Sequence, residues 1–273
     1  MKYYNWGNIS KSVTYQNIIT DWVNLLNNNC LKEADYHKFL SENPYFFLTP
    51  IDTYLVISKL KLGSEYETDF VMVKEGYSDG TIYELIEIES PHAKLFDKSG
   101  KPTATFNSAL QQILDWKRFL KNDKHFFRKF LPTTNAKIIN ESRIEFKLII
   151  GRRSENQEEL EKRRQYAEEY KIKIISYDQL SEIAQSRKIF PNEPLISSGQ
   201  THFLEDINKK NQLANPFFSC INDSTWKTIC RAGHTKHFYT NYLDSILEAR
   251  KYSKYFDDFT KEKINILPEI GIV

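Results

Sequence analysis

Three acidic residues interrupt two apolar segments of the sequence. Asp69 stands in TDFVMV, and Glu87 and Glu89 stand in ELIEIES. Burying a carboxylate without a partner costs free energy, so acids inside apolar strands are candidates for a functional site. Because side chains alternate along a strand, Glu87 and Glu89 are expected on one face, while Ile86 and Ile88 enter the core from the other. Two carboxylates then share one surface.

The two acidic segments can pair as an antiparallel hairpin. Ser78 lies halfway between Asp69 and Glu87, in the turn-rich EGYSDG, so the turn permits a register in which the two acids face each other. Clustered carboxylate oxygens suit Mg²⁺ or Mn²⁺, because the ion offsets their repulsion and keeps open positions for phosphate and water. The acids could instead lie on the wet face of an edge hairpin or pair with Lys and Arg. Spacing alone leaves both interpretations open.

An α/β domain is expected to position these acids. Apolar spacing and turn residues predict, in chain order, helices over 18–26 and 33–40, strands in YLVISKLKLG, TDFVMV and IYELIEIES, a helix over 105–119, a strand in IEFKLIIG, a helix in EELEKRRQYAEEY, a strand in KIKIIS and a helix over 177–184. The last strand–helix–strand spacing favours a parallel crossover. The predicted fold class is therefore α/β, a mixed β-sheet core flanked by helices.

The predicted elements divide the chain into three parts. Residues 1–32 are expected to form an N-terminal helical segment, and residues 33–190 form the mixed-sheet domain. Over 191–273 the signal weakens to a mainly helical or irregular C-terminal extension, with a helix expected over 242–256.

The composition narrows the class of protein. The chain has 273 residues, 40% of them hydrophobic and 27% charged, as in compact globular proteins. A net charge of +2 is not the global basicity of a protein that coats nucleic acid, so any contact with a polyanion is expected through a local patch. There is no signal-peptide pattern and no apolar run of the about 20 residues that a membrane span requires, so we expect a cytoplasmic protein without a membrane partner. The missing P-loop, G-x-G-x-x-G and nucleophile elbow argue against an NTPase, a dinucleotide enzyme and a serine hydrolase.

Five segments, taken in order, carry a family resemblance. They are LGSEYETDFVMV, ELIEIESPHAKLF, TFNSALQQILDWKRFL, FKLIIGRR and YKIKIISYDQL. This series resembles the Shedu anti-phage nuclease family, a branch of the PD-(D/E)XK restriction-endonuclease-like superfamily, over residues 33–185. The resemblance implies a restriction-endonuclease-like core that hydrolyses DNA phosphodiester bonds with Mg²⁺ or Mn²⁺, in bacterial defence against phage. It also implies a homo-oligomer.

The resemblance assigns roles to individual residues. It makes Asp69 and Glu87 metal ligands and Glu33 the helix-borne acid that completes the site. Gln112 and Trp116 match a Q-x-x-x-(W/Y) helix motif found beside such sites, and their spacing places both on one helix face. Trp116 is expected to lie in the core.

Glu89 departs from the family pattern, which has a lysine at this position to orient the attacking water and stabilise charge on the phosphate. A carboxylate cannot do the electrostatic work of a cation. Glu89 could be a further metal ligand in a two-metal site, a lysine such as Lys94 or Lys117 could have taken over the role, or the site could have lost catalysis. The last alternative describes a restriction-like fold that binds nucleic acid without cleaving it.

Basic residues near these motifs are candidates for DNA contact. The helix of the glutamine motif and its continuation carry Lys117, Arg118, Lys121, Lys124, Arg128 and Lys129. This pattern resembles a flank that follows phosphates, but it is also typical of a solvated face. Arg152 and Arg153 stand where a strand ends and a helix begins, so they could meet an anion or pair with an acid of the same domain. Lys94, just after the acidic strand, completes the expected DNA-binding set.

Overall fold

The computed structural model describes residues 13–48, 53–75, 81–122 and 143–186. Its helices are α2 (Val13–Asn27), α3 (Glu33–Glu42), α4 (Pro44–Phe47), α5 (Ala104–Asn122), α7 (Gln157–Tyr170) and α8 (Tyr177–Ser186). Its strands are β1 (Thr53–Ser58), β2 (Lys61–Leu62), β3 (Tyr66–Glu67), β4 (Phe70–Glu75), β5 (Thr81–Ile88), β6 (Ile144–Ile149) and β7 (Lys173–Ile175). The helix expected over 242–256 and the basic residues Lys124, Arg128 and Lys129 lie outside the described residues. None of the described helices has the length and apolar character to cross a membrane.

The main sheet is mixed, as predicted. Its strand order is β1-β4-β5-β6-β7. The β1–β4 and β4–β5 pairs are antiparallel, and the β5–β6 and β6–β7 pairs are parallel. Phe70 pairs with Ile86, so the next step of the register places Asp69 opposite Glu87. Both the predicted hairpin and the predicted parallel crossover are confirmed.

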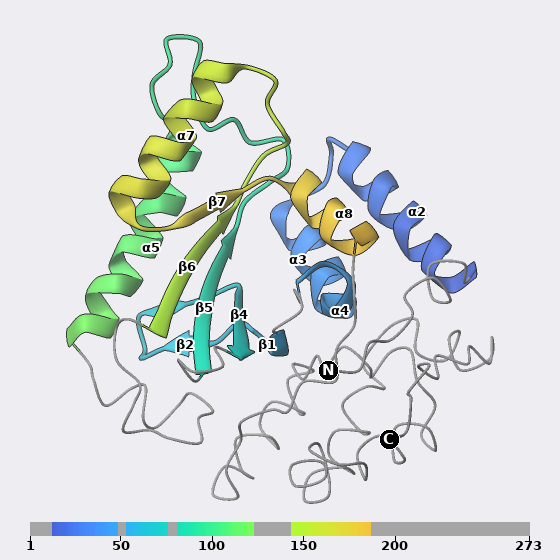
Figure 1. The fold of residues 1–273 in the computed structure, drawn as a ribbon, viewed down its shortest axis with the longest axis horizontal. Helices are drawn as coiled ribbons and strands as arrows, with labels where there is room; N and C mark the ends of the chain where they lie inside the picture. The colour runs from blue at the N-terminus through green and yellow to red at the C-terminus, as the bar shows by residue number, and fades with distance from the viewer. Residues whose placement is uncertain (1–12, 49–52, 76–80, 123–142, 187–273) are drawn as a thin grey trace, which may run out of the picture.

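Helices lie on both sides of this sheet (Figure 1). Helices α5 and α7 run side by side on one side, and α2, α3, α4 and α8 group on the other. The first group packs on the main core through buried side chains such as Ile113 and Trp116 of α5. The second group packs around Trp22, whose ring lies 4.5 Å from that of Phe47 and 5.9 Å from that of Tyr177.

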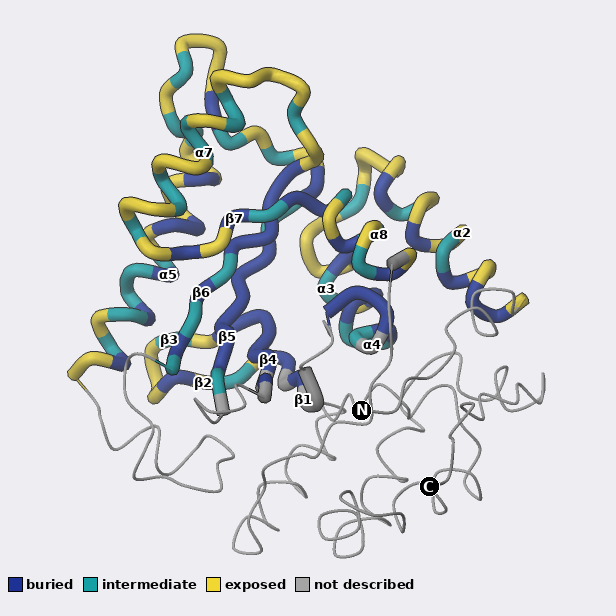
Figure 2. The backbone as a smooth tube through the Cα atoms, viewed as in Figure 1, coloured by how far each residue is buried: buried dark blue, intermediate teal, exposed yellow. Residues whose placement is uncertain are grey.

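Strand β5 runs through the centre of the domain and is buried along most of its length (Figure 2). Tyr83 and Leu85 face the core under α5, and Glu87 follows on the same face by the alternation of a strand. Ile86 and Ile88 are fully buried on the opposite face. The sheet therefore delivers Glu87 at the carboxyl end of its best-packed strand.

The prediction of one long strand over YLVISKLKLG is wrong at Lys59. Strand β1 ends at Ser58, and Lys59 has a φ of 53°, a left-handed conformation that a strand cannot continue. The chain re-enters a strand only at Lys61, where β2 pairs with β3 in a separate two-stranded sheet. This break places the Lys59 side chain beside the end of the hairpin.

Candidate functional site

An acidic cleft of about 700 Å³ opens at the carboxyl end of β5, against α5 and the β2–β3 hairpin. It is lined by Glu33, Lys59, Glu65, Tyr66, Glu67, Asp69, Glu87, Glu89, Ser108, Gln111, Gln112, Asp115 and Trp116. The structure thus brings together all five of the predicted catalytic residues, Asp69, Glu87, Glu89, Glu33 and Gln112. Lys59 is the one cation in this lining.

Asp69 is held from several directions at the start of β4. Only 3% of the residue is exposed, its Oδ2 accepts a hydrogen bond from the Ile88 backbone N–H at 2.8 Å, and its Oδ1 accepts one from Lys59 Nζ. The His37 ring stacks on Phe70, and His37 Nε2 lies 3.3 Å from the Asp69 carbonyl oxygen. These contacts fix both the backbone and the carboxylate of Asp69.

Glu87 is the most strongly perturbed acid of the cleft. It is 6% exposed, and its Oε2 is buried with no hydrogen-bond partner among the described residues. Burial, followed by the negative charges of Asp69 and Glu33, raises the pKa of Glu87 to about 10. At neutral pH and without a cation, the Glu87 carboxyl group therefore keeps its proton.

Glu89 and Glu33 respond to the same field from more open positions. Burial and the charges of Glu33 and Asp69 raise the pKa of Glu89 to about 7. Burial and Asp69 also raise the pKa of Glu33, which is the first residue of α3, although Lys59 opposes the shift. Among the described residues, the lining of this cleft thus has seven acids and one lysine, and burial together with the charges of neighbouring acids raises the pKa values of Glu33, Glu87 and Glu89.

Lys59 and His37 were missed by the sequence interpretation. Burial opposes the charged ammonium of Lys59, but the hydrogen bond and the charge of Asp69 raise its pKa above the usual value. The pairing of β1 with β4 matches Ser58 with Phe70, so the next position sets Lys59 beside Asp69, and the Lys59 N–H donates to the Asp69 carbonyl oxygen at 2.9 Å. A register argument from the SKLK segment is the signal that could have found it.

The carboxylates of the acidic cleft could bind a divalent cation only together with other ligands. Among the described residues, no three His, Cys, Asp or Glu side chains converge closely enough to hold a metal ion by themselves. Mg²⁺, however, usually binds through one or two carboxylates and completes its shell with waters and substrate phosphates. The buried, unpartnered oxygen of Glu87 next to Asp69 fits such a partly hydrated ion.

Gln112 and Trp116 occupy one wall of the cleft on α5. Trp116 is fully buried in the main core, as predicted, while Gln112 is partly exposed. Neighbouring Gln111 donates to Asp115 at 2.8 Å, and Arg118 pairs with the same carboxylate at 3.0 Å. Arg118 of the predicted basic helix therefore lies next to a residue that lines the cleft.

The other basic candidates do not join the acidic cleft. Lys117 donates to the backbone carbonyl oxygens of Tyr170 and Lys171, at the end of α7, so its ammonium is engaged away from the acids. Lys121 is exposed in the last turn of α5. Lys94 lines a different pocket, so neither lysine proposed to replace the motif lysine lines the acidic cleft.

Arg152 and Arg153 follow the second of the two alternatives left open by the sequence, pairing within the domain. Arg152 contacts the Asp178 carboxylate through Nε and Nη2, at 3.0 and 2.8 Å from Oδ1. Arg153 pairs with Glu182. Both acids lie on α8, so the two arginines tie the end of β6 to that helix.

Comparison with known proteins identifies a family for this chain. The family model described as Shedu protein SduA, C-terminal, matches residues 31–181, more than half of the chain. No curated protein and no solved structure matches the chain. The matched range contains the whole acidic cleft and every strand of the main sheet.

Proposed function

The chain belongs to the family of the Shedu protein SduA C-terminal domain, a family of anti-phage defence, and from this premise we propose that its acidic cleft is the active site of a metal-dependent DNA endonuclease. The order of helix, three antiparallel strands, helix and parallel strand supports a restriction-endonuclease-like core for this activity. Double-stranded DNA, including that of phage, is the proposed substrate.

The observation that carries the proposal is the buried pair of Asp69 and Glu87. Two buried carboxyl groups, one with an unpartnered oxygen and a strongly raised pKa, open onto a cleft large enough for a phosphodiester. Burial of such a pair lowers the stability of the folded protein, and a perturbed acid of this kind is typical of a functional site. Binding of a cation during catalysis would offset this cost.

The residues of the cleft divide the proposed reaction among them. Asp69 and Glu87 hold Mg²⁺ or Mn²⁺, and Glu89 and Glu33 add oxygen donors directly or through water. Such an ion, when bound, polarises a phosphate oxygen and lowers the pKa of a water that attacks the phosphorus in line. Because Glu87 and Glu89 must lose their protons to act as ligands, binding is coupled to proton release. Gln112 offers an amide donor to the phosphate from α5.

Lys59 supplies the positive charge that Glu89 cannot. Its ammonium already forms an ion pair with the Asp69 carboxylate, and nearly half of its side chain is exposed. A cation here can turn from Asp69 to the phosphate as negative charge grows on the phosphate oxygens. Lys59 thus takes the role for which the sequence offered Lys94 or Lys117.

A second candidate function is nucleic-acid binding without cleavage. The specific observation that favours it is that Lys59 already neutralises Asp69, while no three described acids converge on a metal position. In that case the cleft is a remnant and DNA binds elsewhere on the domain. Cleavage and binding assays separate the two functions.

The test is cleavage of linear and supercoiled DNA with Mg²⁺ or Mn²⁺. Asp69→Asn is expected to reduce cleavage by about 100-fold or more, the scale of losing one electrostatic group from an active site. Lys59→Gln is expected to reduce it by about 10- to 100-fold. Lys61→Gln is the matched control, because Lys61 is exposed two residues away and does not line the cleft.

Two results contradict the proposed enzyme. Wild-type protein that binds DNA but cleaves no form of it with either metal supports the second function instead. Full cleavage by Asp69→Asn places the active site elsewhere. Loss of cleavage in Lys61→Gln as well as Lys59→Gln shows a general charge effect rather than a role of Lys59.

A further inference from the structure

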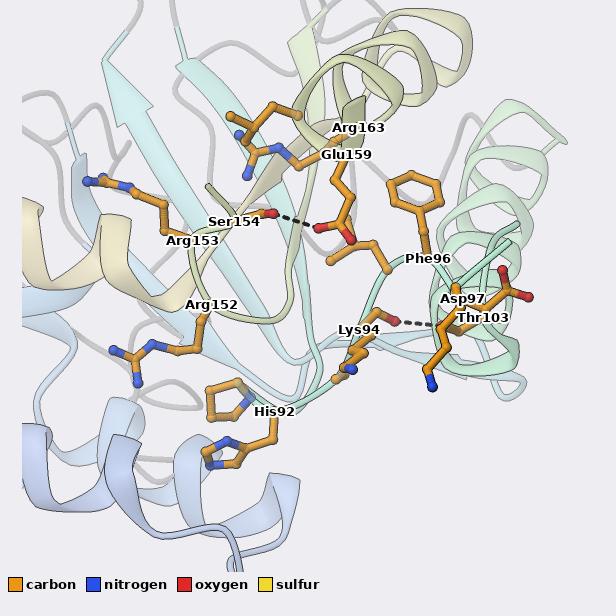
Figure 3. A pocket seen from close by; sticks show the side chains of 15 residues that line it. His92, Lys94, Phe96, Asp97, Thr103, Arg152, Arg153, Ser154, Glu159 and Arg163 are labelled. Carbon is orange, nitrogen blue, oxygen red and sulfur yellow. Dashed lines mark hydrogen bonds between the residues drawn. The ribbon is translucent and has the colours of Figure 1, made fainter. Parts of the chain in front are cut away.

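A second pocket of about 630 Å³ shares no lining residue with the acidic cleft. It lies between the loop that follows β5, the loop that follows β6 and the first turns of α7 (Figure 3). Five of its lining residues are cations: Lys94, Lys98, Arg152, Arg153 and Arg163. We call this set the basic pocket.

Among the described residues, the cations of the basic pocket outnumber the acids of its lining. Asp97 and Glu159 are the acids of the lining, and both are already engaged. Asp97 accepts hydrogen bonds from the Ser99 hydroxyl at 2.7 Å and from the Lys101 backbone N–H at 3.0 Å, and Glu159 accepts one from Ser154 Oγ at 2.6 Å. Figure 3 shows the Ser154–Glu159 bond beside the arginines.

Arg163 is the cation that most needs a partner. Within the described part of the chain, no acid pairs with Arg163, Lys94 or Lys98. Arg163 is half-buried, and burial together with the positive charges of Arg153 and Arg164 lowers the pKa of its guanidinium. A bound anion would relieve this repulsion and satisfy the guanidinium hydrogens.

Arg152 and Arg153 give the pocket a fixed wall. Their pairs with Asp178 and Glu182 hold the loop after β6 against α8, so this side of the pocket is already ordered before a ligand arrives. A pre-ordered wall reduces the entropy that binding must offset. The unpaired cations Lys94 and Lys98 lie on the loop after β5 and face the same space.

The size and floor of the pocket favour an organic anion over a bare ion. Ala93, Leu95 and Leu160 provide an apolar and partly exposed floor under the charges. Apolar surface with a few convergent charges, in a volume of about 300–1,000 Å³, is typical of small-molecule and cofactor sites. The pocket also lies at the carboxyl ends of the parallel strands β5 and β6, where open α/β sheets bind ligands.

We propose that the basic pocket binds the phosphate group of a nucleotide, with the base or sugar on the apolar floor. The nucleotide can be free or can be part of a DNA strand. Glu89 lines the acidic cleft and His92 lines the basic pocket. These residues are three positions apart, so their Cα atoms lie within about 11 Å of each other. A strand that crosses the acidic cleft could therefore reach this pocket. The proposal does not depend on the acidic cleft being a nuclease.

The test is equilibrium binding by calorimetry in EDTA, which removes any metal-dependent activity from the measurement. The probes are dAMP, deoxyadenosine, and a short single-stranded oligonucleotide with and without a 5′-phosphate. Arg163→Gln is expected to weaken binding of a phosphate-bearing probe by about 10-fold or more, as the loss of a charge-assisted hydrogen bond does. Arg164→Gln is the matched control, because Arg164 is the next residue of α7, pairs with Glu161 and does not line the pocket.

The outcomes are distinct. Binding of dAMP but not deoxyadenosine, weakened only by Arg163→Gln, supports a free nucleotide. Binding of the oligonucleotide alone, weakened only by Arg163→Gln, supports a phosphate of the strand. Equal effects of the two substitutions, or no difference between dAMP and deoxyadenosine together with no effect of Arg163→Gln on the oligonucleotide, overturns the proposal. None of these results decides whether the acidic cleft cleaves DNA, which the metal-dependent assay decides separately.

Discussion

At the scale of single residues, the acidic cleft is a compromise between charge and burial. Asp69 is paired with Lys59 and accepts a hydrogen bond from a backbone N–H, and both contacts offset the cost of burying its carboxylate. Glu87 has no such partner and keeps a proton instead, which the raised pKa expresses. The two acids thus meet the same desolvation cost in different ways, Asp69 through its contacts and Glu87 through its proton.

The raised pKa of Glu87 predicts the pH dependence of stability. Without metal, the folded protein keeps the Glu87 proton up to a pH of about 10, whereas the unfolded chain releases it near the ordinary glutamate pKa of 4.5. The unfolded state therefore binds fewer protons in this window, and the free energy of unfolding falls as the pH rises. One such group gives a slope of up to about 1.4 kcal/mol per pH unit.

Glu87→Gln removes this slope, since glutamine mimics the protonated acid and never ionises. In EDTA, the variant is expected to be more stable than the wild type, by a margin that grows from pH 5 to pH 9. Urea denaturation at several pH values measures this margin. Glu168→Gln, on the exposed face of α7, is the control and should leave the wild-type slope intact; a Glu87→Gln curve parallel to that of the wild type would show that Glu87 is already ionised in the folded protein.

At the scale of elements, the sequence predicts the hairpin better than its surroundings. The positions of Asp69 and Glu87 on either side of the EGYSDG segment permitted the register that the strands adopt, because the two-residue period of a strand allows few alternatives. The role of Lys59 could not be predicted, because hydrophobic periodicity treats YLVISKLKLG as one strand. The left-handed backbone of Lys59 ends that strand and is not visible in the pattern. The partners of Arg152 and Arg153 were hidden because Asp178 and Glu182 lie about one helix and one strand away in the chain.

Gly151 joins the loops that follow β5 and β6, and its replacement is predicted to be costly. Its φ is 68°, its N–H donates to the Ser90 carbonyl oxygen at 3.1 Å, and an added Cβ would lie 2.7 Å from the Ala93 carbonyl oxygen. A backbone oxygen cannot move aside as the end of a side chain can. Gly151→Ala is expected to lower the free energy of unfolding by about 3 kcal/mol or more, as the left-handed backbone and the clash act together.

Gly100→Ala separates these two effects. Gly100 also has a positive φ, of 76°, but the atom nearest an added Cβ is the flexible Nζ of Lys162. The expected loss is about 1–2 kcal/mol, from the backbone conformation alone. Thermal and urea unfolding compare the two variants, and equal losses would mean that the contact between Gly151 and Ala93 relaxes without cost.

At the scale of the whole molecule, a net charge of +2 conceals two opposed local fields. The acidic cleft and the basic pocket both form around the carboxyl end of β5, so one central strand positions a set of acidic side chains and a set of basic ones. Helix α2 is hydrogen-bonded to α8, because Tyr15 donates to the Ala184 carbonyl oxygen and Trp22 donates to Ser181 Oγ. Composition could exclude a broadly basic protein, but only the folded sheet separates the charges in space.

The two fields predict that Mg²⁺ stabilises the molecule through the acidic cleft alone. A ligand that binds only the folded state adds about 2.7 kcal/mol to the free energy of unfolding at a concentration of 100 times its Kd, and this raises Tm by several degrees. At pH 8, Tm is expected to rise on adding MgCl₂ relative to NaCl of equal ionic strength, and the rise should shrink at pH 6 because Glu87 and Glu89 then hold their protons more firmly. Asp69→Asn should abolish the rise while Arg163→Gln, in the basic pocket, should preserve it. An equal rise of Tm in the wild type and in Asp69→Asn would show that MgCl₂ acts as a nonspecific salt and that the carboxylate pair binds no ion.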